Sequence, residues 1–505
     1  MKKILSIIVL SGLLMTSCSL EEEPPFLSDQ NVYADAENAK AALNGIYDGL
    51  AGYEMYSNVY YFFNGLYSGM MVSRRGGNNV NTQFNSTLAT MAAASGELNN
   101  GRVWTQIYRA VARANGAIYS AIPTADPSTD DELVINDVVG HAYFVRAFSY
   151  YMLVSIWGEV PLRLEPSTPD NTNLAVSTQK EIYDQILLDC NMADSLINGS
   201  AGTSFPQVYA VNMLKAKVYM SLATESEDVQ DGSTNYWQAA YDEAIKVYGH
   251  YTLVEDYAEL FNEETSDGTS ESIFELQSSD GASHDWVRAF TPNNYTKANT
   301  FGWLQVNADF YNLHADTYPG DQRIAATYLS SWTQQNNGNI TNKWPVNSSR
   351  NNFGNAHPFF FKLAEKDVSN TSQVGNQNMI IFRYADLLLM LAEISNELQN
   401  GEQLDYVTEV LNRVGLSPQA AYYGTQDDFR TAVMREYQFE LLGEGFDCIN
   451  VRRRGFDWMK THIIDFHNNN PIFDASVDVT FSGEKDKVME LPIPDAEVNA
   501  NQNIN

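Results

Sequence analysis

Residues 137–157 are the segment that most restricts which folds the chain can adopt. As a helix they would be apolar on nearly every face, through Val138, Val139, Ala142, Tyr143, Val145, Phe148, Tyr151, Met152 and Ile156. A helix of this kind needs other helices around it, so it must be buried. Gly158 and Pro161 mark its end. The segment therefore predicts a mostly α fold with a helix at its centre.

Other segments have the pattern of amphipathic helices. In 178–197, Thr178 and Glu181 form a capping box ahead of an apolar stripe. The predicted helices cover about 36–50, 102–121, 137–157, 178–197, 208–224, 236–248, 379–398, 403–414 and 426–442. Helix pairs with short turns are typical of tetratricopeptide-like stacking. We expect one body over 31–505, with a helical scaffold at about 36–250 and 379–445.

Helical periodicity is lost between about 250 and 378. Aromatic residues and Asn are frequent there, and four of the eight Trp fall within 281–361. Only 272–277 alternates apolar and polar residues as a strand does. Loops that carry aromatics and amides on a rigid scaffold are typical of binding sites. This region is therefore predicted to be mixed, loop-rich and ligand-binding.

Composition excludes several classes of partner. The chain has 63 Asp and Glu against 31 Lys and Arg, a net charge of -32. No basic surface is left for nucleic acid or for anionic lipid headgroups. Aromatic residues make up 12%, which excludes a disordered acidic chain. The many uncharged amides suit neutral polar ligands.

The N-terminus indicates export and lipid attachment. Lys2 and Lys3 precede an apolar run at 4–15 that is too short to span a bilayer, as in a signal peptide. The following Thr16-Ser17-Cys18 resembles a lipobox, so we expect residues 1–17 to be removed and Cys18 to carry the lipid. Residues 18–30 form an acidic linker that resembles an export tag for the outer face of the outer membrane. A soluble secreted protein with a chance cysteine is the alternative.

No catalytic or metal-binding motif stands out. The chain lacks G-x-S-x-G, H-E-x-x-H and a P-loop, and its seven His fall singly. Residues 267–271 could hold a structural Ca²⁺, but they lack the further oxygen ligands of an EF-hand. Cys190 and Cys448 are expected to be separate buried thiols. We therefore expect a binding protein, not an enzyme, without a cofactor.

Six blocks in order resemble the SusD-like (RagB/SusD) outer-membrane lipoproteins, over nearly the whole mature chain. They are ALNGIY at 42–47, WTQIY with AN at 104–115, RAFSYY with WGEVPL at 146–162, RYADLLLMLAE at 383–393, RE to EG at 435–445 and LPIP at 491–494. Two segments depart from the family pattern. The aromatic run at 60–67 lies where ligand contacts fall in the family, and the ending at 499–503 is reduced.

The resemblance implies a function. Such a protein sits on the cell surface, captures a nutrient, usually an oligosaccharide, and acts as a lid on a SusC-like, TonB-dependent barrel that imports it. Aromatic faces would stack on sugar rings while amides and Arg bind hydroxyls. A peptide- or glycoprotein-capturing member of the same superfamily and a surface adhesin are the alternatives.

The charged family blocks have a structural interpretation. Arg383 and Asp386 share one helix face and can pair with each other, or with Glu393 and the Glu436/Glu440/Glu444 stripe. We expect a buried Arg–carboxylate network that fixes helix register, with ligand contact as the alternative. The only basic run, 452–454, is expected to pair with the surrounding acids.

The resemblance places the ligand in a shallow patch made by the loop after the first helix and by the irregular region. The ligand-binding candidates are Arg74, Arg75, Asn78, Asn79, Trp286, Arg288, Tyr295 and Trp303. Each Trp is also a core candidate, because a large apolar ring gains most when buried. Trp332 and Trp344 are reserve candidates, whereas Trp104 and Trp157 belong to scaffold blocks.

Overall fold

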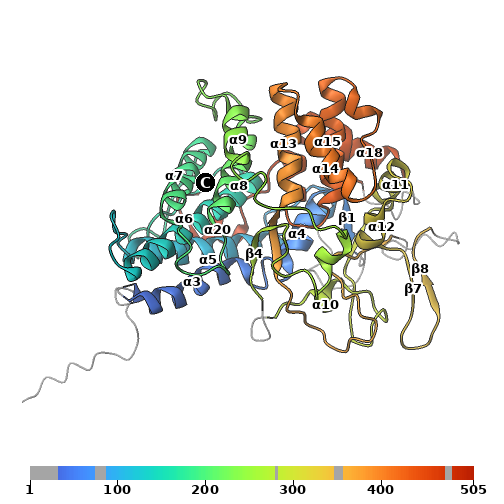
Figure 1. Ribbon diagram of the computed structural model, residues 1–505, viewed down its shortest axis with the longest axis horizontal. Coiled ribbons are helices and arrows are strands. Elements are labelled where there is room, and N and C mark those ends of the chain that lie inside the picture. Colours follow the sequence, from blue (N-terminus) through green and yellow to red (C-terminus); the bar gives the residue numbers. More distant parts are fainter. Residues whose placement is uncertain are drawn as a thin grey trace, which may run out of the picture.

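The computed structural model describes residues 32–33, 35–73, 87–278, 283–345, 357–471 and 480–504. The predicted signal peptide and the linker with Cys18 lie outside them. Helices dominate the described chain in an N-terminal and a C-terminal group, with short strands and loops beside them (Figure 1). The predicted mostly α fold is confirmed. No helix in these ranges has both the length and the hydropathy needed to cross a bilayer.

The N-terminal group contains stacked helical pairs. Its helices are α3 (Ala36–Ala51), α5 (Leu98–Ser120), α6 (Asp130–Trp157), α7 (Gln179–Leu196), α8 (Val208–Leu222) and α9 (Tyr236–Ala244). Consecutive helices pack on one another from α5 to α9, and α3 packs on α5 and α6. Nearly all of α6 is buried, as predicted. It begins before the expected Asp137, because Thr129 and Glu132 form a capping box.

The C-terminal group is built on α13 (Tyr384–Leu398), α14 (Gln403–Arg413) and α15 (Gln426–Glu440). Because α13 also packs on α9, it joins the two groups. The helix expected at 379–398 begins five residues late, since β10 (Met379–Arg383) pairs antiparallel with β4 (Ser272–Leu276). Short helices complete the group: α16 (Asp447–Arg453), α17 (Phe456–Met459), α18 (Asp465–Asn469) and α19 (Lys485–Val488). The last helix, α20 (Asp495–Ala500), lies instead against the N-terminal group (Figure 1), where the Asn501 side chain donates to the carbonyl of Leu174 at 2.8 Å.

The irregular region mixes short helices and strands, as predicted. Its helices are α10 (Trp286–Phe290), α11 (Ala308–Thr317) and α12 (Gln322–Thr327). A four-stranded sheet has the order β1 (Met71–Ser73), β5 (Leu304–Val306), β9 (Phe359–Phe360) and β6 (Tyr328–Leu329). Two further strand pairs are β2 (Val160–Pro161) with β3 (Val176–Ser177), between α6 and α7, and the hairpin of β7 (Ser331–Thr333) with β8 (Ile340–Asn342).

The aromatic run at 60–67 forms a helix, α4 (Val59–Tyr67), at the middle of the molecule (Figure 1). Every residue of α4 is buried. Asn64 donates a hydrogen bond to Asp447, and Tyr67 donates one to the carbonyl of Val488 at 3.2 Å. This run, which departs from the family pattern, therefore fills the core between the two helical groups.

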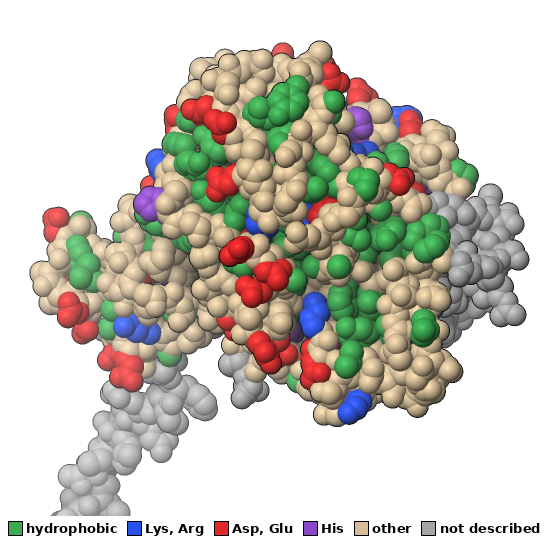
Figure 2. All heavy atoms as spheres, turned by 45° about the vertical axis from the view of Figure 1, so that its right-hand side comes forward, with side chains coloured by type: hydrophobic (Ala, Val, Ile, Leu, Met, Phe, Trp, Pro, Cys, Tyr) green, Lys and Arg blue, Asp and Glu red, His purple; other side chains and the backbone are tan. Residues whose placement is uncertain are grey.

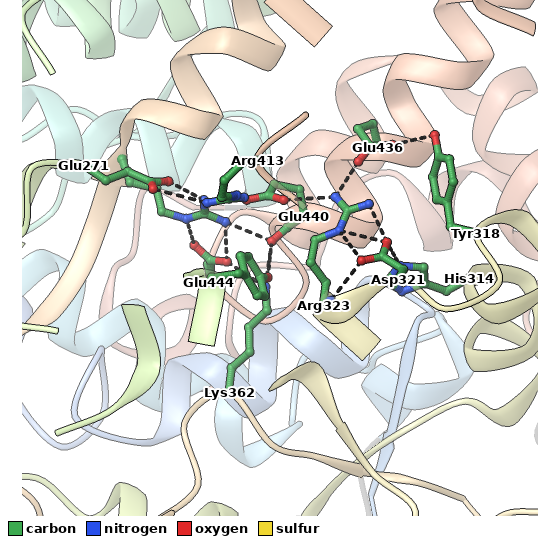
Figure 3. Close-up of polar contacts among 12 residues, drawn as sticks. Glu271, His314, Tyr318, Asp321, Arg323, Lys362, Arg413, Glu436, Glu440 and Glu444 are labelled. Atoms are coloured by element: carbon green, nitrogen blue, oxygen red, sulfur yellow. Dashed lines mark hydrogen bonds and ion pairs between the residues drawn. The ribbon is translucent and has the colours of Figure 1, made fainter. Parts of the chain in front are cut away.

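A cluster of charged side chains joins the irregular region to the C-terminal helices (Figure 3). It consists of Glu271, Asp321, Arg323, Lys362, Arg383, Arg413, Glu436, Glu440 and Glu444. Glu440 accepts from Arg383 at 2.7 Å and from Arg323 at 3.0 Å. The predicted buried network is thus confirmed for Arg383. Asp386 instead pairs with Lys217, at 2.7 Å.

The three Arg side chains of the basic run at 452–454 are bonded to other groups of the protein. Arg453 and Arg454 pair with the buried carboxylate of Glu393, at 2.6 and 3.0 Å. This confirms the predicted pairing for those two residues. Arg452 donates instead to two backbone carbonyls.

Cys190 in α7 and Cys448 in α16 are free and buried. This confirms their interpretation as separate thiols. Burial raises the pKa of the Cys448 thiol to about 12, so the thiol stays protonated at neutral pH.

Candidate functional site

An open cleft of about 650 Å³ lies in the irregular region. Three segments line it: residues 262–264 after a short 3₁₀ helix, Ser283 ahead of α10, and residues 365–376 ahead of β10. We call it the polar cleft. Its lining residues are Asn262, Glu263, Glu264, Ser283, Glu365, Lys366, Asp367, Asn370, Ser372, Val374, Gly375 and Asn376.

Backbone hydrogen bonds fix the wall formed by 365–376. Arg288 N donates to the carbonyl of Gln373 at 3.0 Å, and His284 and Gly375 exchange two bonds of 2.9 and 3.1 Å. A Cβ at Gly375 would lie 3.0 Å from the His284 ring, so glycine permits this close approach. The wall is therefore held against the segment that carries α10.

The cleft is rich in hydrogen-bond acceptors. Burial, with the neighbouring charge of Glu365, raises the pKa of Glu263. The Glu263 carboxylate accepts from the backbone N–H of Asn376 at 3.2 Å, which orients it. Carboxylates only accept, whereas amides both donate and accept, so this lining matches a ligand with many hydroxyl groups.

Lys366 contributes little positive charge to the cleft. Its ammonium group donates to the carbonyls of Phe361, Lys362 and Ala364 at 2.7, 3.0 and 2.5 Å, and it lies 4.5 Å from the Phe361 ring centre. Burial lowers its pKa to about 7. Because its donors are directed to the backbone, the cleft presents mainly negative charge. The face seen in Figure 2 likewise shows several groups of acidic side chains and few basic ones.

The predicted tryptophans lie in the core. Trp286 is 2% exposed, and its indole N–H donates to the carbonyl of Tyr56 at 2.9 Å. Trp303 is 6% exposed and stacks on Phe301 with ring centres 5.0 Å apart. This corrects their prediction as ligand-binding residues, since neither ring presents a free face. For both residues, burying the large apolar ring in the core stabilises the protein more than leaving the ring exposed to solvent would.

The other predicted residues fall into two sets. Tyr295 and Arg288 are partly buried behind the cleft wall, where the Tyr295 hydroxyl lies 3.5 Å from the carbonyl of Lys366 and Arg288 lies over the Phe301 ring. The remaining four lie outside the described residues: Arg74, Arg75, Asn78 and Asn79.

The reserve and excluded tryptophans are also placed. Trp332 is buried, edge-to-face with Phe359, and Trp344 donates to Asn312 at 3.0 Å. Trp104 and Trp157 are both 3% exposed, which agrees with their assignment to the scaffold.

In the segment considered for Ca²⁺, residues 267–271, the carboxylates are bonded to other groups of the protein. Asp267 accepts from the backbone N–H of Asn378 at 2.6 Å, and Glu271 pairs with Arg383 and Arg413. Within the ranges that the structure describes, no three His, Cys, Asp or Glu side chains gather as metal ligands.

Sequence reasoning missed the two segments that line the cleft most extensively, 262–264 and 365–376. Neither contains an aromatic residue, and aromatic rings were the signal sought. The available signal was the density of short polar residues in KDVSN at 366–370, which is typical of a loop with side chain–backbone hydrogen bonds.

Comparison with known proteins decides the family. A family model described as "SusD family" matches residues 217–505, more than half of the chain. The chain belongs to the SusD family. A second model, described as "Starch-binding associating with outer membrane", matches residues 20–220.

Relatives of the SusD family match over most of their length. SusD-like protein P2 of Formosa agariphila is 26% identical over 439 residues, 80% of each chain. A SusD homolog from Bacteroides thetaiotaomicron has a TM-score of 0.77 at 20% identity, covering 94% of this chain and 97% of that one. A laminarin-binding SusD-like protein has a TM-score of 0.69 at 20% identity, covering 93% and 98%. The resemblance seen in the sequence and the helical fold are thus confirmed.

Proposed function

We propose that this SusD-family protein binds an oligosaccharide in the polar cleft and delivers it to a SusC-like, TonB-dependent barrel in the outer membrane. The binding requires no covalent chemistry, and the energy for transport comes through the partner. A laminarin-binding relative of the same fold supports carbohydrate as the ligand class.

The lining of the polar cleft is the observation that carries the proposal. Sugar hydroxyls donate to carboxylates such as Glu263 and Glu264 and both donate to and accept from amides such as Asn370. The cleft is open, so a chain can extend beyond it. Its negative charge favours neutral glycans over sulfated or uronic ones, because a buried or clustered carboxylate repels an anionic ligand.

Calorimetry on a ligand chosen by a glycan array tests the binding role. The variant Glu263→Gln with Glu264→Ala should weaken binding at least ~10-fold, equivalent to ~1.4 kcal/mol, while the melting temperature stays unchanged. Glu259→Ala is the matched control, because Glu259 is exposed nearby but does not line the cleft. A protein that binds no glycan on the array but binds peptides would replace this proposal with the peptide-capturing alternative.

The proposed anchor is the lipid on Cys18, facing outward from the outer membrane. A lipid chain contributes ~0.8 kcal/mol per buried CH₂, so Cys18→Ala should release the protein into the soluble fraction in cells that lack the barrel. Co-purification of the lipidated protein with a TonB-dependent barrel tests the partner. A free-standing adhesin would purify without one.

A further inference from the structure

A second concave surface, of about 490 Å³, lies between α3 and β4. We call it the α3–β4 groove. It shares no lining residue with the polar cleft. Its lining includes Asn44, Tyr47, Asp48, Phe205, Gln277 and Ser278.

The α3–β4 groove combines an aromatic ring with exposed polar groups. The partly buried Phe205 ring stacks on the buried ring of Tyr47, with centres 5.5 Å apart and planes inclined by 28°. Asn44 and Gln277 are exposed amides at the rim. An aromatic face packs against the apolar face of a sugar ring, and amides bond its hydroxyls. The polar cleft lacks such an aromatic ring.

Hydrogen bonds to α6 fix the loop that leads to Phe205. The buried carboxylate of Asp137 accepts backbone hydrogen bonds from Asn198, Gly199 and Ala201 at 2.8, 3.1 and 2.7 Å. These bonds satisfy backbone donors in the turn that leads to Phe205. A ring on a rigid loop loses little conformational entropy when a ligand binds.

The floor of the groove is fixed as well. The Tyr47 hydroxyl is hydrogen-bonded to Nδ1 of His141 at 2.8 Å, and the His141 ring lies 5.5 Å from that of Phe205. Burial lowers the pKa of His141 to about 4, so this ring is neutral at pH 7. Tyr47 therefore keeps the orientation in which it supports Phe205.

The α3–β4 groove and the polar cleft are neighbours. Asn376 lines the cleft. Two residues on, the Asn378 side chain accepts from Ser278 N at 2.9 Å and donates to Glu275 at 2.8 Å, and both of these partners line the groove. Two extended residues span roughly 7 Å. One oligosaccharide chain is long enough to reach both surfaces.

We propose that the α3–β4 groove is a second carbohydrate subsite, in which Phe205 stacks on a neutral sugar ring of the same chain that occupies the polar cleft. This inference rests on the proposed function and deepens it. It requires that affinity rise with chain length and that one oligosaccharide bind per protein.

Calorimetry on the full-length protein in detergent tests the subsite. The probes are length series of laminari-, malto- and cello-oligosaccharides, from disaccharide to hexasaccharide. Phe205→Ala and Gln277→Ala should each weaken binding of the longest bound members by about 10-fold, while short members keep their affinity. The matched control is Tyr423→Ala, which removes an aromatic side chain that is 65% exposed and lines neither surface.

Each outcome has one meaning. Unchanged affinity of both variants for long chains overturns the subsite but leaves the proposed function standing. Equal losses for short and long chains, or two oligosaccharides bound per protein, also overturn it. If the wild-type protein binds none of the three series, the result counts against the proposed function itself. Melting temperatures are measured throughout, and Gln277→Ala, on an exposed side chain, decides the matter if Phe205→Ala fails to fold.

Discussion

Arg323 on α12 and Glu440 at the end of α15 form an ion pair of 3.0 Å in which neither side chain has any exposed surface. Glu440 also pairs with Arg383 and Arg413, from two further elements. Although burial alone would raise its pKa, these three guanidinium groups hold the pKa of Glu440 well below its usual range. One carboxylate thus ties α12 of the irregular region to β10, α14 and α15.

We predict that Glu440→Gln costs about 3–5 kcal/mol of unfolding free energy, because it removes the negative charge that three buried guanidinium groups share and leaves their ion pairs with Glu440 broken. Urea denaturation measures the loss. Glu484→Gln is the control, since its ion pair with Lys487 is exposed, and its cost should stay below about 1 kcal/mol. Equal effects of the two substitutions would show that burial does not set the strength of the cluster.

Trp286→Ala should destabilise the protein by about 3–5 kcal/mol, the range for truncating a large buried aromatic side chain. Its packing against Tyr61 and its hydrogen bond to Tyr56 are both lost. Thermal unfolding and calorimetry on the same sample separate stability from binding. If glycan affinity fell while the melting temperature held, the ring would be a ligand platform after all.

The helices were the predictable part of this fold, because their patterns are local. The capping boxes at Thr178 and Thr425 and the long apolar run of α6 are visible within single windows of sequence. α4 was not predictable in the same way, since all nine of its residues are buried and no polar face gives a period. The sequence of a short, fully buried run has the same apolar pattern whether the run forms a helix or a strand, and whether it packs in the core or lines a ligand site.

Stability should fall as the pH drops from 7 to 5. Burial lowers the pKa of both His284 and His357 to about 4, whereas an unfolded His titrates near 6.5. Their contribution is therefore complete above about pH 6.5 and is lost towards pH 4, at a cost of ~2 kcal/mol each by pH 5. Asp447 acts in the opposite direction, because burial raises its pKa to about 6, and protonation returns ~1 kcal/mol over this interval.

Urea titrations at pH 7 and pH 5 measure this dependence. His284→Gln removes one of the titrating groups, so the variant should lose ~2 kcal/mol less than the wild type between the two pH values. An unchanged pH dependence would mean that His284 takes up its proton in the folded protein as readily as in the unfolded chain, and so is protonated at pH 5. In that case its Nδ1 could not accept from the backbone N–H of Trp286, as it does at 3.4 Å.

Two glycine substitutions should act with opposite sign. Gly443 has φ +78°, and an added Cβ would collide with the ring of Phe360, so Gly443→Ala should cost at least about 2 kcal/mol. Gly45 lies within α3 with open space around it, and Gly45→Ala should stabilise by about 0.5–1 kcal/mol. Melting temperatures of the two variants should lie on either side of the wild type. A Gly443 variant as stable as the wild type would show that the segment after α15 can move aside.

The candidate sites were harder to predict than the scaffold. Aromatic residues in a loop-rich region mark either a ligand platform or a small core, and Trp286 and Trp303 proved to be core. The polar cleft instead depends on hydrogen bonds between segments about 90 residues apart, such as that of His284 with Gly375. Phe205 lies in a loop of the helical half, and only the fold brings it beside β4.

The position of α4 also bears on how the chain reaches its native state. Asn64 is 383 residues from its partner Asp447, and Tyr67 is 421 residues from Val488. Closing such loops costs entropy before any contact is gained, so formation of this core should be slow. Until the last sixty residues or so are made, the mostly apolar and aromatic residues of α4 lack the part of their cover that α16 and the C-terminal segment supply, and they are open to aggregation. A chain that ends before residue 445 should therefore collect as insoluble protein rather than as a smaller folded unit.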